Sequence, residues 1–147
     1  MMRIAALDYG TKRVGVAVAH TEVGVALPAT VLPNDIEQIV RWLQQEQVQK
    51  VIIGAPYLMW GDAGARVREV EAFAEQLRQR LQVPVELVDE RLTTVEAERR
   101  LREGEYPRKQ REQMVDAVAA ALILENYLWR TRSKKVNRRQ ARRTRRK

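Results

Sequence analysis

The sequence has no cysteine, one histidine and one serine, and these scarcities exclude several kinds of chemistry. Without cysteine the chain cannot form disulfides, iron–sulfur clusters, thiolate zinc sites or cysteine nucleophiles. A lone His20 cannot supply a zinc site of the HExxH kind. The only serine, Ser133, lies among basic residues near the C-terminus, so the body of the chain has no serine nucleophile. Catalysis would therefore depend on carboxylates, whose hard oxygens suit Mg²⁺ or Mn²⁺.

Long apolar runs and a leader sequence are also missing. No apolar run approaches the ~20 residues that a membrane span requires. The first residues, MMRIAALD, lack the small-residue cleavage site of a signal peptide. The length of 147 residues suits one domain with a real core. We therefore expect a cytoplasmic protein that makes no membrane contact.

Acidic residues are absent from segment 130–147, which contains eleven lysines and arginines. Residues 1–129 hold the other 16 basic residues together with all 19 acidic ones and so carry a net charge of −3, whereas segment 130–147 carries +11, which gives the whole chain its +8. Because the segment has little apolar surface, we predict a folded domain over residues 1–129 and a mobile basic tail over 130–147. The tail could simply aid solubility, but its arginines favour binding to a polyanion, with candidate contacts at Arg138, Arg139, Arg142 and Arg143.

Apolar periodicity predicts five strands and four helices. The strands fall at residues 3–8, 14–20, 25–32, 50–54 and 83–88, and the helices at about 36–47, 67–81, 93–104 and 110–129. Asn34 and Glu37 form a possible capping box for the first helix, and Pro28 restricts the third strand to a sheet edge. This order predicts an α/β fold in which a mixed five-stranded sheet carries helices on both faces.

Three acidic residues lie where such a fold can bring them together. Asp8 ends the first strand, and Glu90 follows the last one. Asp116 is the only polar side chain between Met114 and Leu124. An unpaired carboxylate in an apolar helix costs several kcal/mol, so it must be protonated or face a compensating charge such as a divalent cation. Together the three acids predict a metal-dependent nuclease.

Each acid also has a purely structural explanation. Asp8 could belong to a tight turn with Gly10, and Glu90 could cap the helix that follows it. Asp116 could pair with an arginine such as Arg91 or Arg111.

Beyond the strand at residues 50–54, Trp60 lies in a glycine-containing loop, where it could stack on a nucleic-acid base or pack in the core or at a dimer interface.

Four segments resemble those of the YqgF family, also called RuvX, in the ribonuclease H-like superfamily. They are LDYGTKRVGVAV at 7–18, the GxP at 54–56, VDERLTT at 88–94 and VDAVAAALIL at 115–124. The resemblance covers residues 3–128 and implies a ribonuclease H-like fold with Asp8, Glu90 and Asp116 as catalytic acids. After Pro56 the chain departs from the family, which resembles LNMDG where this chain has YLMWG.

The resemblance implies hydrolysis of RNA phosphodiesters in 5′-end maturation of pre-16S ribosomal RNA, within ribosome biogenesis. The three acids would hold two Mg²⁺ or Mn²⁺ ions, and Lys12, Arg13 or Arg91 would contact phosphate oxygens. Two alternatives remain open. One is a Holliday junction resolvase that acts on branched DNA, and the other is a non-catalytic RNA-binding factor for ribosome assembly. A monomer and a homodimer are both compatible with the sequence, although a resolvase is expected to be a homodimer.

Overall fold

A computed structural model of the chain describes all residues except 1, 56–63, 90–98, 100–102, 105–107 and 146–147. The side chains of 108–112 and 132–145 are not described either. The predicted helix at 93–104 therefore lies largely outside the described residues, as do Trp60, Glu90 and Arg91.

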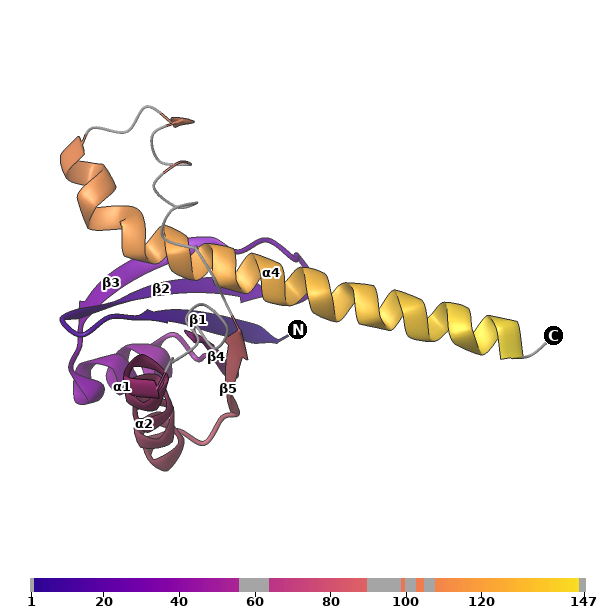
Figure 1. The fold of residues 1–147 in the computed structure, drawn as a ribbon, viewed down its shortest axis with the longest axis horizontal. Coiled ribbons are helices and arrows are strands. Elements are labelled where there is room, and N and C mark those ends of the chain that lie inside the picture. The colour runs from indigo at the N-terminus through magenta and orange to yellow at the C-terminus, as the bar shows by residue number, and fades with distance from the viewer. Residues whose placement is uncertain (1, 56–63, 90–98, 100–102, 105–107, 146–147) are drawn as a thin grey trace.

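A mixed five-stranded sheet lies at the centre of the fold, as predicted (Figure 1). Its strands are β1 (Arg3–Tyr9), β2 (Arg13–His20), β3 (Leu27–Pro33), β4 (Lys50–Ala55) and β5 (Val85–Asp89). Their spatial order is β3-β2-β1-β4-β5, with antiparallel pairing among the first three and parallel pairing of β4 with β1 and of β5 with β4. Because β1, β4 and β5 run parallel, their carboxyl ends lie at the same edge of the sheet, with the end of β4 directly beside that of β1 and the end of β5 two strands away.

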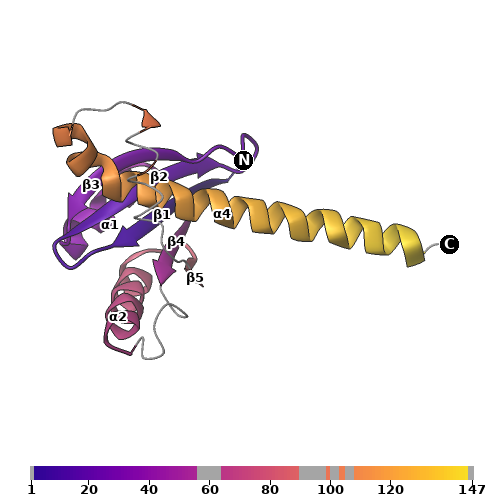
Figure 2. The same cartoon turned by 45° about the horizontal axis from the view of Figure 1, so that its top comes forward.

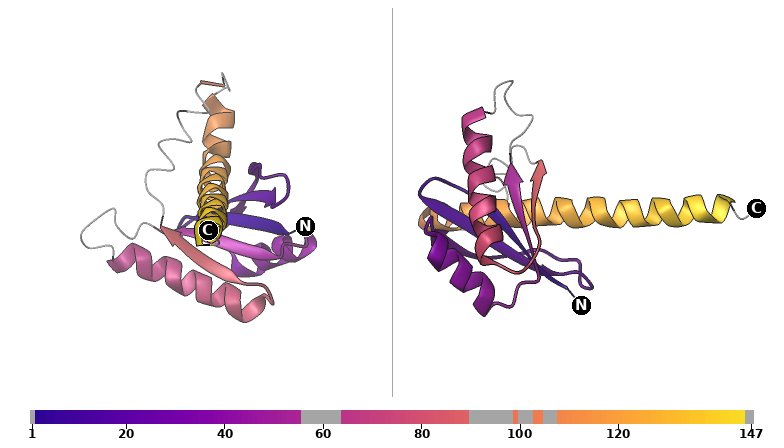
Figure 3. Two further views of the ribbon diagram at one scale, coloured as in Figure 1. Left: turned by 90° about the vertical axis from the view of Figure 1, so that its right-hand side faces the viewer. Right: turned by 90° about the horizontal axis from the view of Figure 1, so that it is seen from below.

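Helices cover both faces of the sheet, which also agrees with the prediction (Figures 1 and 3). They are α1 (Ile36–Gln45) and α2 (Gly64–Arg80) on one face and α4 (Arg108–Arg145) on the other. Ile53 and Leu77 belong to the core beneath α1 and α2, whereas Ile52 and Leu124 belong to the core beneath α4. None of the described helices is long and apolar enough to cross a membrane.

The predicted capping box of α1 was wrong. Asp35 is the N-cap, and its carboxylate accepts hydrogen bonds from the backbone N–H groups of Glu37 and Gln38. Asn34, one residue earlier, instead donates its side-chain amide to the carbonyl oxygen of Gly10 at 2.8 Å. Asn34 therefore fixes the turn between β1 and β2, next to the end of β1.

The predicted end of the last helix was also wrong. We expected it near Trp129, whereas α4 continues without interruption to Arg145 and projects far beyond the sheet (Figure 2). The physical reason is that residues 130–147 contain no glycine or proline to end a helix and are rich in arginine, a good helix former. The division of the chain into a folded domain and a mobile tail stays a prediction.

Gly15 determines how closely α4 can approach the sheet. Its position on β2 faces α4, and a Cβ atom built there would lie 2.0 Å from the backbone oxygen of Asp116. No side chain fits in that space, and the neighbouring atoms are backbone atoms that cannot rotate away. The absence of a side chain at Gly15 is therefore what allows α4 to lie directly on β2 at Asp116.

Gly15→Ala should force α4 away from β2 and lower the free energy of unfolding by about 1 to 3 kcal/mol, the usual cost of overpacking. Urea unfolding of the full-length chain, followed by circular dichroism, measures this loss. Gly104→Ala, at an exposed position, is the matched control and should change little. Equal stability of Gly15→Ala and the parent would contradict the close contact.

Candidate active site

Asp8 lies near the end of β1 on the face that α4 covers. The alternation of the strand places it there, because Ile4 and Ala6 belong to the core beneath α4. Asp8 pairs across the sheet with Gly15 of β2. Since Gly15 is the residue on which α4 rests, Asp8 is next to the point where the helix contacts the sheet.

Asp116 is brought to Asp8 by this contact. Its side chain is 19% exposed, and it belongs to neither of the two apolar clusters that α4 helps to form. The two carboxylates are close enough for the charge of Asp116 to raise the pKa of Asp8. The predicted meeting of these two acids, far apart in the sequence, is therefore present in the structure.

Asp116 has a described partner, the guanidinium of Arg13 at the start of β2. Asp116 therefore does form an ion pair with an arginine, which was the structural explanation considered for it, but the described partner is Arg13 rather than the Arg91 or Arg111 that the sequence suggested. The side chains of Arg91 and Arg111 are not described. Hydrogen bonding to Asp116 also raises the pKa of Arg13. Arg13 is 59% exposed, so the pair lies at the rim of the site where solvent screens it.

Burial, reinforced by the negative charge of Asp116, raises the pKa of Asp8 from 3.8 to about 7. Arg66 at the start of α2 acts in the opposite direction and lowers it. The Arg66 guanidinium donates a hydrogen bond of 3.0 Å to the carbonyl oxygen of Tyr9 and lies 5.6 Å from the centre of the Tyr9 ring. The sequence analysis missed Arg66, because an arginine in the first turn of an amphipathic helix carries no distinctive signal.

Glu90, the third predicted acid, lies outside the described residues. β5 ends at the preceding residue, Asp89, two strands from β1 in the sheet order. Val88 belongs to the core beneath α4, and Leu87 packs against the core on the opposite face. Strand alternation therefore assigns Asp89 to the α2 side, where one of its carboxylate oxygens is buried and has no hydrogen-bond partner among the described residues.

The predicted nucleic-acid contacts are only partly described. Lys12 is exposed in the turn between β1 and β2, close in sequence to Arg13. Arg91 and Trp60 lie outside the described residues. The candidate tail contacts occupy the helical extension of α4, where the backbone but not the side chains is described: Arg138, Arg139, Arg142 and Arg143.

The described part of the site suits a hard divalent cation. Burial and the nearby charge of Asp116 on α4 both disfavour the charged form of Asp8, so a cation beside the two carboxylates would relieve both costs. Within the described residues no three potential ligands form a complete cage. A Mg²⁺ ion nevertheless commonly needs only one or two protein carboxylates, with water and substrate oxygens as its other ligands.

Comparison with known proteins relates the chain to one family. The family model described as RuvX, Holliday junction resolvase, matches residues 2–130. A relative from Chloroflexus aurantiacus is 42% identical over 136 residues, which are 88% of each chain. One from Bacteroides fragilis is 38% identical over 133 residues, 87% of this chain and 96% of the relative. The names of both mark them as candidate pre-16S rRNA nucleases.

Solved structures confirm the predicted fold class. Thermus thermophilus RuvC in complex with a Holliday junction substrate matches with a TM-score of 0.55 and 14% identity, over 89% of this chain and 96% of that one. A second Thermus thermophilus RuvC structure gives a TM-score of 0.51 at 16% identity, over 90% of this chain and 97% of that one. At these identities the likeness concerns the fold alone, which is the ribonuclease H-like α/β fold.

The raised pKa of Asp8 predicts how the stability of the metal-free protein depends on pH. The folded state holds the Asp8 proton more tightly than the unfolded chain, so the free energy of unfolding should fall as pH rises from about 4 to about 7. The full shift corresponds to a loss of about 4 kcal/mol at most. Asp8→Asn cannot lose the proton and should be more stable than the parent above pH 7.

Urea unfolding in EDTA across this pH range tests the prediction. Glu71→Gln removes an exposed carboxylate from α2 and is the matched control, expected to follow the parent. If the free energy of unfolding changed with pH in the same way for Asp8→Asn and the parent, the pH dependence could not come from a raised pKa of Asp8.

Proposed function

The chain belongs to the RuvX family, and from that membership we propose that it is a divalent-metal-dependent nuclease that cleaves RNA in the maturation of pre-16S ribosomal RNA, in the cytoplasm. The observation that carries the proposal is the contact of α4 with Gly15, which brings the carboxylates of Asp8 and Asp116 together at the end of the central strand. The names of the relatives support RNA as the substrate.

We assign the ion to Asp8 and Asp116, with Glu90 as a third ligand. Glu90 is preferred to Asp89 because the alternation of β5 assigns Asp89 to the face that α2 covers. A divalent ion bound there would lower the pKa of a water molecule and offset negative charge on the phosphate. Mg²⁺ and Mn²⁺ both suit oxygen ligands of this kind.

Arginines at the rim supply positive charge for the substrate. Arg13 balances Asp116 in the metal-free protein, and its exposed guanidinium can turn to a phosphate oxygen of the substrate instead. Arg66 stays beside Asp8, held by the carbonyl oxygen and ring of Tyr9. Fixed donors of this kind stabilise charge that develops on the phosphate during hydrolysis.

Cleavage of branched DNA is the second candidate function. The description of the matching family and the structural likeness to RuvC favour it. A resolvase must cut two symmetric strands and would act as a homodimer. A non-catalytic RNA-binding factor, the third candidate, would bind RNA but show no metal-dependent cleavage.

Asp8→Asn and Asp116→Asn should each abolish cleavage in Mn²⁺, because both remove charge needed to hold the ion while preserving side-chain shape. The assay offers single-stranded RNA, duplex RNA, single-stranded DNA and a four-way DNA junction, with Glu71→Gln as the control. Parent activity in either variant would refute the metal mechanism. Cleavage confined to the junction would replace RNA processing by DNA resolution as the function.

Binding of the ion can be measured without cleavage. Mn²⁺ should raise the melting temperature of the parent at pH 8, because an ion that binds only the folded state stabilises it. Asp8→Asn should lose most of this increase. An equal increase in the variant and the parent would mean that the ion binds elsewhere.

The helical extension of α4 is proposed to bind the phosphate backbone of the substrate. It carries basic residues four positions apart, such as Arg138 with Arg142 and Arg139 with Arg143, and residues 130–147 contain no acid to compensate them. Like charges at this spacing destabilise an isolated helix, and a polyanion removes that cost. The extension therefore gains helical stability when it binds nucleic acid.

Deletion of residues 132–147 should weaken binding of single-stranded RNA and spare the rate at saturation, because it leaves Asp8 and Asp116 intact. The deletion keeps Thr131, whose hydroxyl donates to the carbonyl oxygen of Tyr127 at 2.9 Å, and removes ten cations. The slope of log affinity against log salt should fall by about 0.7 for each phosphate that the shortened helix no longer neutralises. An unchanged slope would leave the extension with a solubilising role only.

A further inference from the structure

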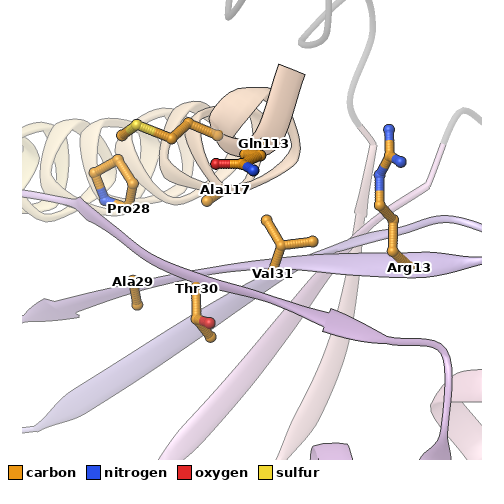
Figure 4. A pocket seen from close by; sticks show the side chains of 8 residues that line it. Arg13, Pro28, Ala29, Thr30, Val31, Gln113 and Ala117 are labelled. Carbon is orange, nitrogen blue, oxygen red and sulfur yellow. The ribbon is translucent and has the colours of Figure 1, made fainter. Parts of the chain in front are cut away.

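A cavity of about 630 Å³ lies between the edge strand β3 and the first turns of α4 (Figure 4). Pro28 and Val31 point into it from β3, and Gln113 and Ala117 face them from the helix. Arg13 lies at the end opposite Pro28. The volume falls within the ~300 to 1,000 Å³ that small-molecule sites usually have.

The cavity shares one residue, Arg13, with the candidate active site. Arg13 lines the cavity and also forms the ion pair with Asp116. Ala117, the residue after Asp116, forms part of its wall. A ligand in this cavity therefore lies against two residues that adjoin Asp116, one through its ion pair and the other as its neighbour in the chain.

The lining combines an apolar surface with one positive charge. Val31 and Met114 offer aliphatic and thioether surface, and methionine sulfur makes favourable contacts with aromatic rings. The Gln113 side chain has both a donor and an acceptor for the edge of a ring. Arg13 is the only charged residue among the described residues that line the cavity. A flat heteroaromatic ring joined to an anionic group matches this lining.

We propose that the cavity binds one unpaired nucleotide of the RNA strand next to the phosphate that is cleaved. Its base packs against Val31 and Met114, its edge reaches Gln113, and its phosphate meets Arg13. The inference rests on the proposed nuclease function and deepens it. A base can enter the cavity only if it is unstacked and unpaired, so the site selects single-stranded RNA at this position.

A peptide strand added to the edge of β3 is the main rival occupant. Pro28 has no N–H to donate to such a strand. The pairing of β3 with β2 also shifts register between Val16 and Ala17, opposite Thr30 and Pro28, so the edge is irregular there. Irregular edges with proline pair poorly with added strands. The nucleotide is therefore the better match.

Val31→Phe, which fills the cavity, and Met114→Ala, which removes its thioether wall, test the proposal in the full-length chain. The matched control is Val25→Phe, the same change at an exposed position outside the cavity. The probe is 2-aminopurine riboside 5′-monophosphate, whose fluorescence reports its environment, titrated in EDTA so that no ion is needed. The parent and the control should bind it, and each cavity variant should weaken binding about tenfold or more. Inorganic phosphate should compete weakly, through Arg13 alone.

Cleavage supplies the second measurement. Val31→Phe should lower kcat/KM for single-stranded RNA about tenfold, and should not lower it for RNA whose nucleotide beside the cut is held in a duplex. Equal probe binding by Val31→Phe and the parent would overturn the proposal. So would equal losses in Val31→Phe and Val25→Phe.

The two proposals can fail separately. If Asp8→Asn cleaves as well as the parent while the parent still binds the probe, the metal mechanism fails and the cavity assignment stands. If cleavage depends on Asp8 but the cavity variants bind and cleave normally, only the cavity assignment fails.

Discussion

The contact between the backbone of α4 and Gly15 of β2 is the constraint on which the site depends. It is a steric constraint, because a single added carbon would lie 2.0 Å from the Asp116 backbone oxygen. The contact places Asp116 beside Asp8, since Gly15 and Asp8 are cross-strand partners. It also brings Asp116 within reach of Arg13, two residues before Gly15 on the same strand. The close contact that Gly15 allows thus determines the positions of Asp8, Asp116 and Arg13 relative to one another.

The charges around this contact explain why the metal-free site can fold at all. Burial, together with the negative charge of Asp116, raises the pKa of Asp8 to about 7. Arg13 offsets Asp116 from the solvent side, and Arg66 offsets Asp8 from the start of α2. Each acid therefore has its own cation, but burial raises the pKa of Asp8 by more than the charge of Arg66 lowers it. That residual cost is what a bound divalent ion would remove.

The sequence predicted those features that follow from local pattern. The strands alternate or are uniformly apolar, Pro28 indicated an edge strand, and the position of Asp116 within an apolar helix indicated an acid that would meet a charged group, which the structure shows to be Arg13. Two kinds of feature were not predictable: contacts made by long side chains from distant parts of the chain, and the role of one residue where its neighbour in the sequence could play the same role. Arg66 acts from another helix, 58 positions from Asp8 in the numbering. Asn34 and Asp35 are both good N-cap residues, and only the turn that Asn34 binds decides between them.

The same helix carries the candidate catalytic acid, a wall of the cavity and the basic extension. A helix rises 1.5 Å per residue, so the 14 residues from Asp116 to Arg130 span about 21 Å, and the 29 residues to Arg145 span about 44 Å. Because α4 is continuous, these distances are fixed while it stays helical. A strand that contacts both Asp116 and the extension must then be long enough to cover at least the shorter distance. In the proposed mode of binding, the cavity would act on the nucleotide beside the cut, whereas the extension would act on phosphates several nucleotides away. Local base recognition and distant electrostatic attraction would then be separated along one helix.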